Sequence, residues 1–174
     1  MKKVLLHICC GVCALHSLDK LKKDLFVPYG FFYNPNIYPA DEQAKRRDAA
    51  CKACSIFGVE FFAGENNYAY WRKVCEPYQA EPEGGLRCLK CYELRLKVAF
   101  DFAVKNGFDY LTSTLTISPH KNSKQIFELA HAVCGAKYLC IDFKKEDGFK
   151  KTMELAREHN LYRQNYCGCE YSLR

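Results

Sequence analysis

The segment His7-Ile8-Cys9-Cys10-Gly11-Val12-Cys13 joins the end of a predicted strand to the start of a predicted helix. The apolar run Val4-Leu5-Leu6 precedes it, and helical periodicity begins at about Ala14. A helix N-terminus carries free N–H groups and partial positive charge, which lower thiol pKa values and favour thiolates. Three cysteines in this turn therefore indicate a metal centre or a reactive sulfur. Simple core packing, the usual role of an isolated cysteine, explains them less well.

Length and composition set the broad class of the protein. The chain has 174 residues, of which 49% are hydrophobic and 14% aromatic, as expected for one folded domain. We predict a single α/β domain over residues 1–174, with a cysteine-bearing tail at 161–174. The chain contains no long apolar run, and Met1-Lys2-Lys3 leads directly into a strand. These features predict a cytoplasmic protein without a membrane segment.

The chain contains twelve cysteines and a formal net charge of +6. Disulfide frameworks belong mostly to small secreted proteins, whereas cysteine clusters in cytosolic enzymes more often bind metals or perform redox chemistry. Intracellular disulfides in thermophiles are the exception to this rule. The positive charge points to a polyanionic partner.

Apolar runs alternate with amphipathic segments along the whole chain. Strands are predicted at residues 3–8, 26–32, 59–63, 110–115 and 138–143. Helices are predicted at residues 14–24, 41–57, 68–75, 86–106, 123–133 and 148–160. This order implies right-handed βαβ units, and hence a Rossmann-like parallel sheet with helices on both faces.

Ligands in such folds bind at the carboxyl ends of the strands. Four segments follow predicted strands and are expected to share one rim: Cys9-Cys10, Tyr33-Asn34-Pro35, the turn after Leu115 and the segment after Phe143.

A second cysteine motif lies in Arg87-Cys88-Leu89-Lys90-Cys91. Helical residues three apart face the same way, so Cys88 and Cys91 can bind one inorganic centre. With Cys9 and Cys10 they provide four thiolates, which suit tetrahedral zinc or a [4Fe–4S] cluster. Adjacent cysteines differ from the usual zinc-ribbon spacing, and we therefore favour the cluster.

A third motif, Cys167-Gly168-Cys169, lies near the C-terminus. A disulfide across one glycine closes a small, strained ring and is easily reduced, which suits delivery of two electrons. Two further metal ligands or two idle thiols are the alternatives.

The remaining cysteines have weaker signals. Cys51 and Cys54 are expected to pack against the sheet, and Cys75, Cys134 and Cys140 in the core, while Cys13 is left open between the site and the helix start.

Five motifs together resemble the epoxyqueuosine reductase family QueH, over Leu6 to Ser172. They are Leu6-His7-Ile8-Cys9-Cys10 with Cys13, Tyr33-Asn34-Pro35-Asn36-Ile37, Arg87-Cys88-x-x-Cys91-Tyr92, Thr114-Leu115-x-x-Ser118-Pro119-His120-Lys121-Asn122, and Tyr162-Arg163-Gln164-x-Tyr166-Cys167-Gly168-Cys169. Family members often carry Ala-Pro where this chain has Gly11-Val12. That departure concerns the shape of the loop and leaves every cysteine of the motif in place.

The resemblance implies a fold similar to adenine nucleotide α-hydrolases and a specific reaction. Epoxyqueuosine at the tRNA wobble position would be reduced to queuosine, with electrons from an unidentified donor. The family's [4Fe–4S] ligands match Cys9, Cys10, Cys88 and Cys91, and its redox-active disulfide matches Cys167 and Cys169. An additional iron ion beside the cluster is implied too, whereas cobalamin and ATP are not.

Basic and aromatic residues at the rim are candidates for tRNA contact, namely Lys121 and Arg163 for phosphates and Tyr33 for base stacking. Two other functions remain open. A zinc-stabilised, non-enzymatic RNA-binding module would use the same cysteines. A tRNA-thiolating enzyme of the same fold would need a Ser-Gly-Gly-x-Asp-Ser-like phosphate loop, and the His7–Cys13 segment stands in its place.

Overall fold

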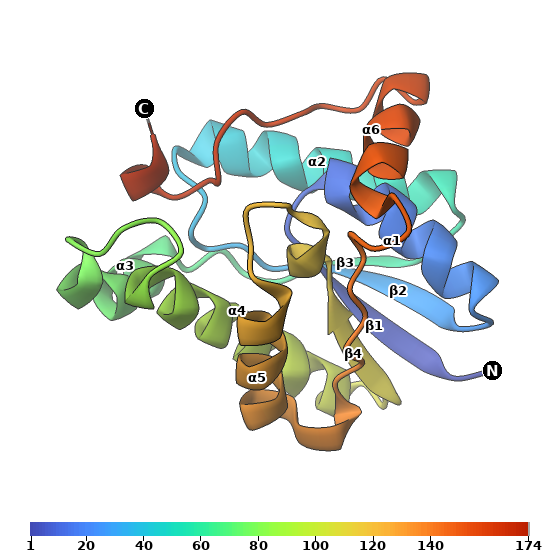
Figure 1. The fold of residues 1–174 in the computed structure, drawn as a ribbon, viewed down its shortest axis with the longest axis horizontal. Coiled ribbons are helices and arrows are strands. Elements are labelled where there is room, and N and C mark those ends of the chain that lie inside the picture. Colours follow the sequence, from blue (N-terminus) through green and yellow to red (C-terminus); the bar gives the residue numbers. More distant parts are fainter. Residues whose placement is uncertain (174) are drawn as a thin grey trace.

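The computed structural model describes residues 1–173, so Arg174 of the predicted tail lies outside the described residues. A four-stranded parallel sheet in the order β3-β2-β1-β4 forms its centre (Figure 1). The strands are β1 (Lys3–Ile8), β2 (Val27–Phe32), β3 (Phe61–Ala63) and β4 (Tyr110–Ser113). The predicted parallel α/β fold is confirmed.

Strand β1 is central in the sheet because it pairs with β2 along one edge and with β4 along the other, and both of its faces are buried. Its side chains alternate between the two faces of the sheet. Val4, Leu6 and Ile8 enter one hydrophobic core, and Leu5 enters the other. A continuous apolar sequence is what a central parallel strand requires.

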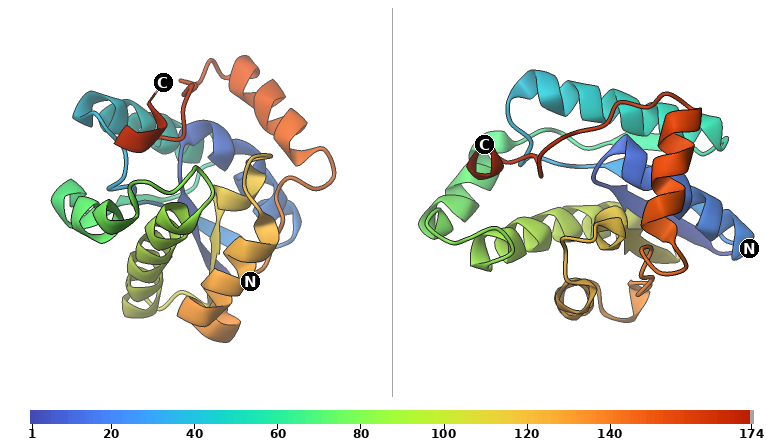
Figure 2. Two further views of the ribbon diagram at one scale, coloured as in Figure 1. Left: turned by 60° about the vertical axis from the view of Figure 1, so that its left-hand side comes forward. Right: turned by 45° about the horizontal axis from the view of Figure 1, so that its top comes forward.

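Two layers of helices cover the sheet (Figures 1 and 2). One face carries α1 (Gly11–Lys23), α2 (Ala40–Ile56) and α6 (Gly148–Glu158), and the other carries α4 (Leu86–Lys105) and α5 (Ser123–Cys134). The short helix α3 (Tyr68–Cys75) lies beside the N-terminal half of α4. Within residues 1–173, no helix combines the length and apolar character needed to cross a membrane.

Helix α1 begins at Gly11, three residues before the predicted start at Ala14. The reason is that Cys10 acts as the N-cap, where its Sγ accepts a hydrogen bond from the Cys13 amide at 3.4 Å. Cys10 and Cys13 therefore belong to the first turn of a helix rather than to a loop. A Cβ at position 11 would lie 2.4 Å from the Ala49 carbonyl carbon of α2, so glycine permits the close approach of α1 and α2.

The predicted fifth strand at 138–143 is wrong. Only Tyr138 forms a bridge to the sheet, opposite Leu111. Beyond it, hydroxyl groups take the place of a strand ladder, because Thr112 donates to the Leu139 carbonyl at 3.0 Å and Thr116 to that of Ile141 at 2.9 Å.

Other predicted boundaries shift slightly. The third strand begins at Phe61, and the fourth ends at Ser113 because residues 114–117 form a 3-10 turn. Cys75 and Cys134 are buried as predicted, but Cys140 is exposed. Cys51 and Cys54 are both predicted to pack against the sheet. Cys54 is buried in the core on that face, but Cys51 is exposed.

Gly11→Ala tests the close approach of α1 to α2. We expect a loss of about 1–3 kcal/mol in the free energy of unfolding, since the added methyl group would overlap the Ala49 backbone. Urea denaturation measures it. The control is Ser55→Ala at an exposed position of α2, which should change stability by less than about 0.5 kcal/mol. Equal stability of the two variants would contradict this packing.

Candidate metal centre

The carboxyl ends of β1, β2 and β4 meet at one edge of the sheet, as predicted. Three hydrogen bonds fix this edge: the Cys9 amide to Thr114 Oγ1 at 2.9 Å, Asn34 Nδ2 to the Ile8 carbonyl at 2.8 Å, and His7 Nδ1 with Ser113 Oγ at 2.9 Å. Burial lowers the pKa of His7 to about 3, so its ring is neutral at physiological pH.

Cys9, Cys10 and Cys13 form a compact group at this edge, with their sulfur atoms all within 4.8 Å of one another. Thr114 Oγ1 donates to the Cys9 sulfur at 3.1 Å, and Gln164 Nε2 donates to the Cys10 sulfur at 2.9 Å. The sequence left the place of Cys13 open; the structure puts its sulfur with the other two.

The three thiols cannot all ionise unaided. Contacts with Cys10 and Cys13 lower the pKa of Cys9, whereas contacts with Cys10 and Cys9, together with burial, raise the pKa of Cys13. The neighbouring Cys13 lowers the pKa of Cys10, but Cys9 and burial outweigh it and raise that pKa to about 12. A cation bound among them would allow further deprotonation, because metal-ligating thiols are thiolates.

Cys88 and Cys91 lie on the inner face of the first turns of α4, both 7% exposed. The Gly84 amide donates to the Cys88 sulfur at 3.2 Å, and Arg95 Nη1 lies 3.9 Å from the Cys91 sulfur. Burial raises the pKa of both thiols. Together with Cys167 and Cys169 they line one narrow cavity.

The two cysteine groups adjoin each other. Cys9 packs against the hydrophobic cluster that contains Cys88, Tyr92, Leu115 and Ile126. The Arg95 guanidinium acts on the pKa of both Cys9 and Cys91. This arrangement supports the prediction that one ligand set combines Cys9, Cys10, Cys88 and Cys91, which stays a prediction.

Unpartnered polar atoms gather around the cysteine-lined cavity. Within the described chain, four buried atoms of its lining residues have no hydrogen-bond partner: Asn36 Oδ1, Trp71 Nε1, Arg87 Nε and Arg95 Nε. Three of the four are N–H donors, and such groups are rarely left unpaired in a protein interior. Free donors together with thiols fit a sulfur-rich anionic group, such as an iron–sulfur cluster.

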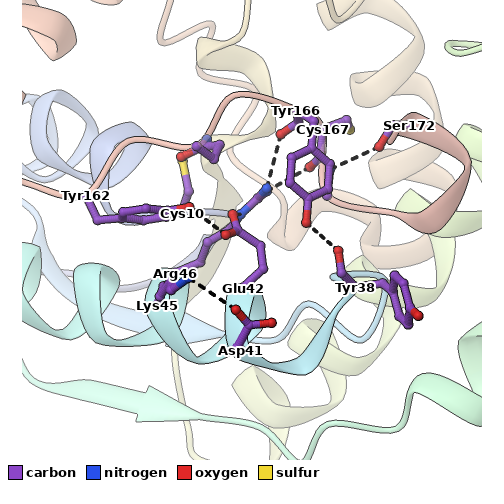
Figure 3. A network of polar contacts seen from close by, with 12 residues as sticks. Cys10, Tyr38, Asp41, Glu42, Lys45, Arg46, Tyr162, Tyr166, Cys167 and Ser172 are labelled. Atoms are coloured by element: carbon purple, nitrogen blue, oxygen red, sulfur yellow. Dashed lines mark hydrogen bonds and ion pairs between the residues drawn. The ribbon is translucent and has the colours of Figure 1, made fainter. Parts of the chain in front are cut away.

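The C-terminal segment is fastened over this cavity by Arg46 of α2 (Figure 3). Arg46 is 2% exposed and pairs with Glu42 at 2.6 Å. Its other nitrogens donate to the carbonyls of Cys167 at 2.9 Å and Tyr166 at 3.2 Å. The backbone of the third cysteine motif is thus attached directly to a buried ion pair.

Further contacts hold both sides of this segment. Tyr162 Oη donates to Glu42 Oε2 at 2.5 Å, and Tyr166 Oη donates to the Tyr38 carbonyl (Figure 3). The Tyr38 amide in turn donates to the Gly168 carbonyl at 2.8 Å. Gly168 has φ +130°, and a Cβ there would lie 2.8 Å from Arg46 Nη1. Glycine between the two cysteines therefore allows the approach of Arg46.

The residues predicted to contact tRNA lie in different environments. Arg163 is exposed. Lys121 is partly buried, and although burial lowers its pKa, the nearby thiols of Cys167 and Cys9 outweigh that effect and raise it. Tyr33 is only 6% exposed and its ring packs near Phe31, which leaves little surface for a base.

Sequence reasoning missed three polar residues of the site: Arg46, Arg95 and Gln164. Arg95 could have been found, because it lies one helical turn after Cys91 on the same face of α4. Arg46 binds a segment more than a hundred positions away, and no local pattern marks that contact. Gln164 stands in the fifth motif of the family resemblance, but its contact with Cys10 is equally remote in sequence.

A family model described as epoxyqueuosine reductase QueH matches residues 4–174. Among curated relatives with that name, the protein of Streptococcus pyogenes serotype M1 is 37% identical over 180 residues, which cover 97% of this chain and 69% of the relative. The Thermotoga maritima protein is 33% identical and covers 99% and 91% of the two chains.

Solved structures with low sequence identity share the fold. One is a predicted subunit of tRNA methyltransferase from Methanocaldococcus jannaschii, with a TM-score of 0.62 at 16% identity, covering 91% of this chain and 75% of that one. Another is the U34-tRNA thiolase NcsA from Methanococcus maripaludis with its [4Fe–4S] cluster, with a TM-score of 0.63 at 15% identity, covering 99% and 62%.

Arg46→Ala tests the attachment of the C-terminal segment. The substitution leaves the Glu42 carboxylate buried without its cation, so we expect a loss of about 3–5 kcal/mol in the free energy of unfolding. Urea denaturation measures the loss.

The neighbouring residue provides a matched control. Lys45 pairs with Asp41 at the surface of the same helix, with both side chains more than half exposed. Lys45→Ala should cost about 0.5 kcal/mol or less. If Arg46→Ala costs no more than Lys45→Ala, the buried pair does not stabilise the segment.

Proposed function

The chain belongs to the epoxyqueuosine reductase QueH family, and we propose that it reduces the epoxide of epoxyqueuosine in a tRNA anticodon to the alkene of queuosine by means of an iron–sulfur centre. Cys9 and Cys10 from the end of β1 and Cys88 and Cys91 from α4 are the proposed ligands of a [4Fe–4S] cluster. An additional iron ion beside the cluster is part of the proposal, without assigned ligands.

The surroundings of the four sulfur atoms carry this proposal. Each lies next to a nitrogen or hydroxyl donor of the protein, from Thr114, Gln164, Gly84 and Arg95 respectively. Donors directed at sulfur stabilise thiolates and tune the metal that they bind. Cysteines that only fill a core would need no such partners.

The reaction removes the epoxide oxygen as water and leaves a carbon–carbon double bond. Both carbon–oxygen bonds break, and the substrate takes up two electrons and two protons. A [4Fe–4S] cluster would supply single electrons, and the additional iron ion, as a Lewis acid, would stabilise negative charge on the oxygen.

The proposed source of the electron pair is the Cys167 and Cys169 dithiol. Oxidation of two thiols to one disulfide releases two electrons and two protons, which equals the demand of the reaction. Both residues line the cavity that contains Cys88 and Cys91. An external two-electron reductant, not yet identified, would then return the disulfide to thiols.

Recognition of tRNA is proposed to depend on positive charge near the rim. Arg163 is exposed on the segment that leads to Cys167, so it is placed to contact a phosphate. The Lys121 ammonium lies nearer the thiols and would act on the part of the substrate inside the site. Tyr33 is a poor candidate for stacking because it is buried.

Substitutions of the cysteines test cofactor and electron relay separately. Cys88→Ser should lower the iron and sulfide content of anaerobically reconstituted protein, because one ligand is lost. A Cys167→Ser, Cys169→Ser double variant should keep its iron and its sulfide but lose turnover of epoxyqueuosine tRNA with a thiol reductant. Metal analysis and mass spectrometry of nucleosides give the two readouts.

Cys140→Ser is the control, since this thiol is exposed and belongs to neither cysteine group. It should match the parent protein in iron content and turnover. A parent protein that carries zinc without iron would instead favour the RNA-binding module. A double variant with normal turnover would exclude the proposed relay.

Arg163→Ala tests the phosphate contact. We expect the slope of log affinity against log salt for anticodon RNA to fall by about 0.7, the value for one contact to a single strand. Fluorescence anisotropy at several salt concentrations measures it.

Lys105→Ala is the matched control, because Lys105 is exposed at the far end of α4, about 28 Å along the helix from Leu86. Its slope should equal that of the parent. An unchanged slope in Arg163→Ala would remove this residue from the binding surface.

A further inference from the structure

Two buried arginines lie beside the cysteines of α4. Arg87 and Arg95 are eight residues apart, flank Cys88 and Cys91 on the inner face of the helix, and are 5% and 3% exposed. Both line the cavity that also contains Cys167 and Cys169. The helix therefore presents two cysteines and two guanidinium groups to one small space.

Neither guanidinium has a carboxylate partner within residues 1–173. Arg46 shows the contrast, since its equally buried charge is paired with Glu42. A buried charge is costly unless an opposite charge accompanies it. The Arg87 guanidinium lies over the Tyr171 ring, 4.9 Å from its centroid, and this contact offsets part of its charge. The remaining positive charge of the two groups favours an anionic group in the cavity.

Hydrogen bonds fix part of each guanidinium group and leave one donor free. Arg87 Nη1 donates to the carbonyls of Gln79 and Glu81, and Arg95 Nη2 donates to Asn34 Oδ1 at 2.5 Å. The Nε–H group of each arginine has no partner in the part of the chain that the structure describes. The two side chains are thus held in place, and the Nε–H group of each is free to donate to a bound group.

Trp71 of α3 adds a third free donor from another element. It is 1% exposed, packs against the rings of Tyr68 and Tyr171, and lines the same cavity. Its Nε1 forms no hydrogen bond of normal geometry with any described residue. The indole packs in one buried cluster with Cys91 and Cys169.

We propose that Arg87, Arg95 and Trp71 are positioning residues that donate to the sulfur atoms of the centre bound at Cys88 and Cys91 and raise its reduction potential. This inference rests on the proposed function, because it takes an iron–sulfur centre as the anion. Reduction adds negative charge to such a centre. Nearby positive charge and N–H groups therefore stabilise the reduced form more than the oxidised form.

The test is the midpoint potential of the anaerobically reconstituted protein, followed by electron paramagnetic resonance. Arg95→Gln removes the charge and should lower the potential by about 59 mV or more, equal to a tenfold change in the ratio of reduced to oxidised centre. Arg95→Lys keeps the charge without the planar donor group and should give an intermediate value.

Trp71→Phe is a second variant, which keeps a six-membered aromatic ring and removes the five-membered ring that carries the N–H donor. It too should lower the potential, and it keeps the test informative if Arg95→Gln fails to fold. Arg47→Gln is the control, because Arg47 is on the exposed side of α2 and pairs with Asp48. Its potential should equal that of the parent.

The outcomes separate the two proposals. A parent protein that binds no iron and sulfide would overturn the proposed function and this inference together. Loaded Arg95→Gln and Trp71→Phe proteins with the parent potential would overturn this inference alone, and would leave the free donors to the substrate.

Discussion

Uncompensated positive charge in the interior is the constraint on which the functional edge of this protein depends. Arg87 and Arg95 are buried without carboxylate partners among the described residues, and their free N–H groups surround a cavity lined by cysteines. An anion in the cavity would stabilise such an arrangement. We propose that thiolates binding a metal cluster provide that anion. The same argument explains why the cysteines of α4 and the tail lie together rather than scattered through the core.

Parallel strand pairing brings the first cysteine motif to this place. Because β1 lies between β2 and β4, its carboxyl end delivers Cys9 and Cys10 to an edge where Asn34 and Thr114 also arrive. Cys10 caps α1, so the helix starts directly at the cysteine turn. The C-terminal segment then crosses the edge and is held there by the Arg46 and Glu42 pair. Three remote parts of the chain are thereby joined by a small set of buried polar contacts.

Local pattern was enough to predict most of the elements and the three cysteine motifs. Apolar periodicity marks β1 and the helices, and cysteine spacing marks Cys88 and Cys91. It failed at residues 138–143, whose apolar sequence resembles a strand although Thr112 and Thr116 bond its carbonyls through their hydroxyl groups. Local pattern also missed Arg46, because in sequence this residue cannot be distinguished from the exposed charged residues of the same helix. Its burial depends on a segment 120 residues later, and sequence periodicity carries no information on such a partner.

The central claim is that sulfur atoms from the end of β1 and from α4 bind one iron–sulfur centre. Anomalous diffraction at the iron absorption edge, from crystals grown without oxygen, tests it most directly. The account predicts a single compact iron signal bonded to Cys9, Cys10, Cys88 and Cys91. Iron bound at only one of the two segments, or a lone zinc ion held by either pair of cysteines, would contradict it.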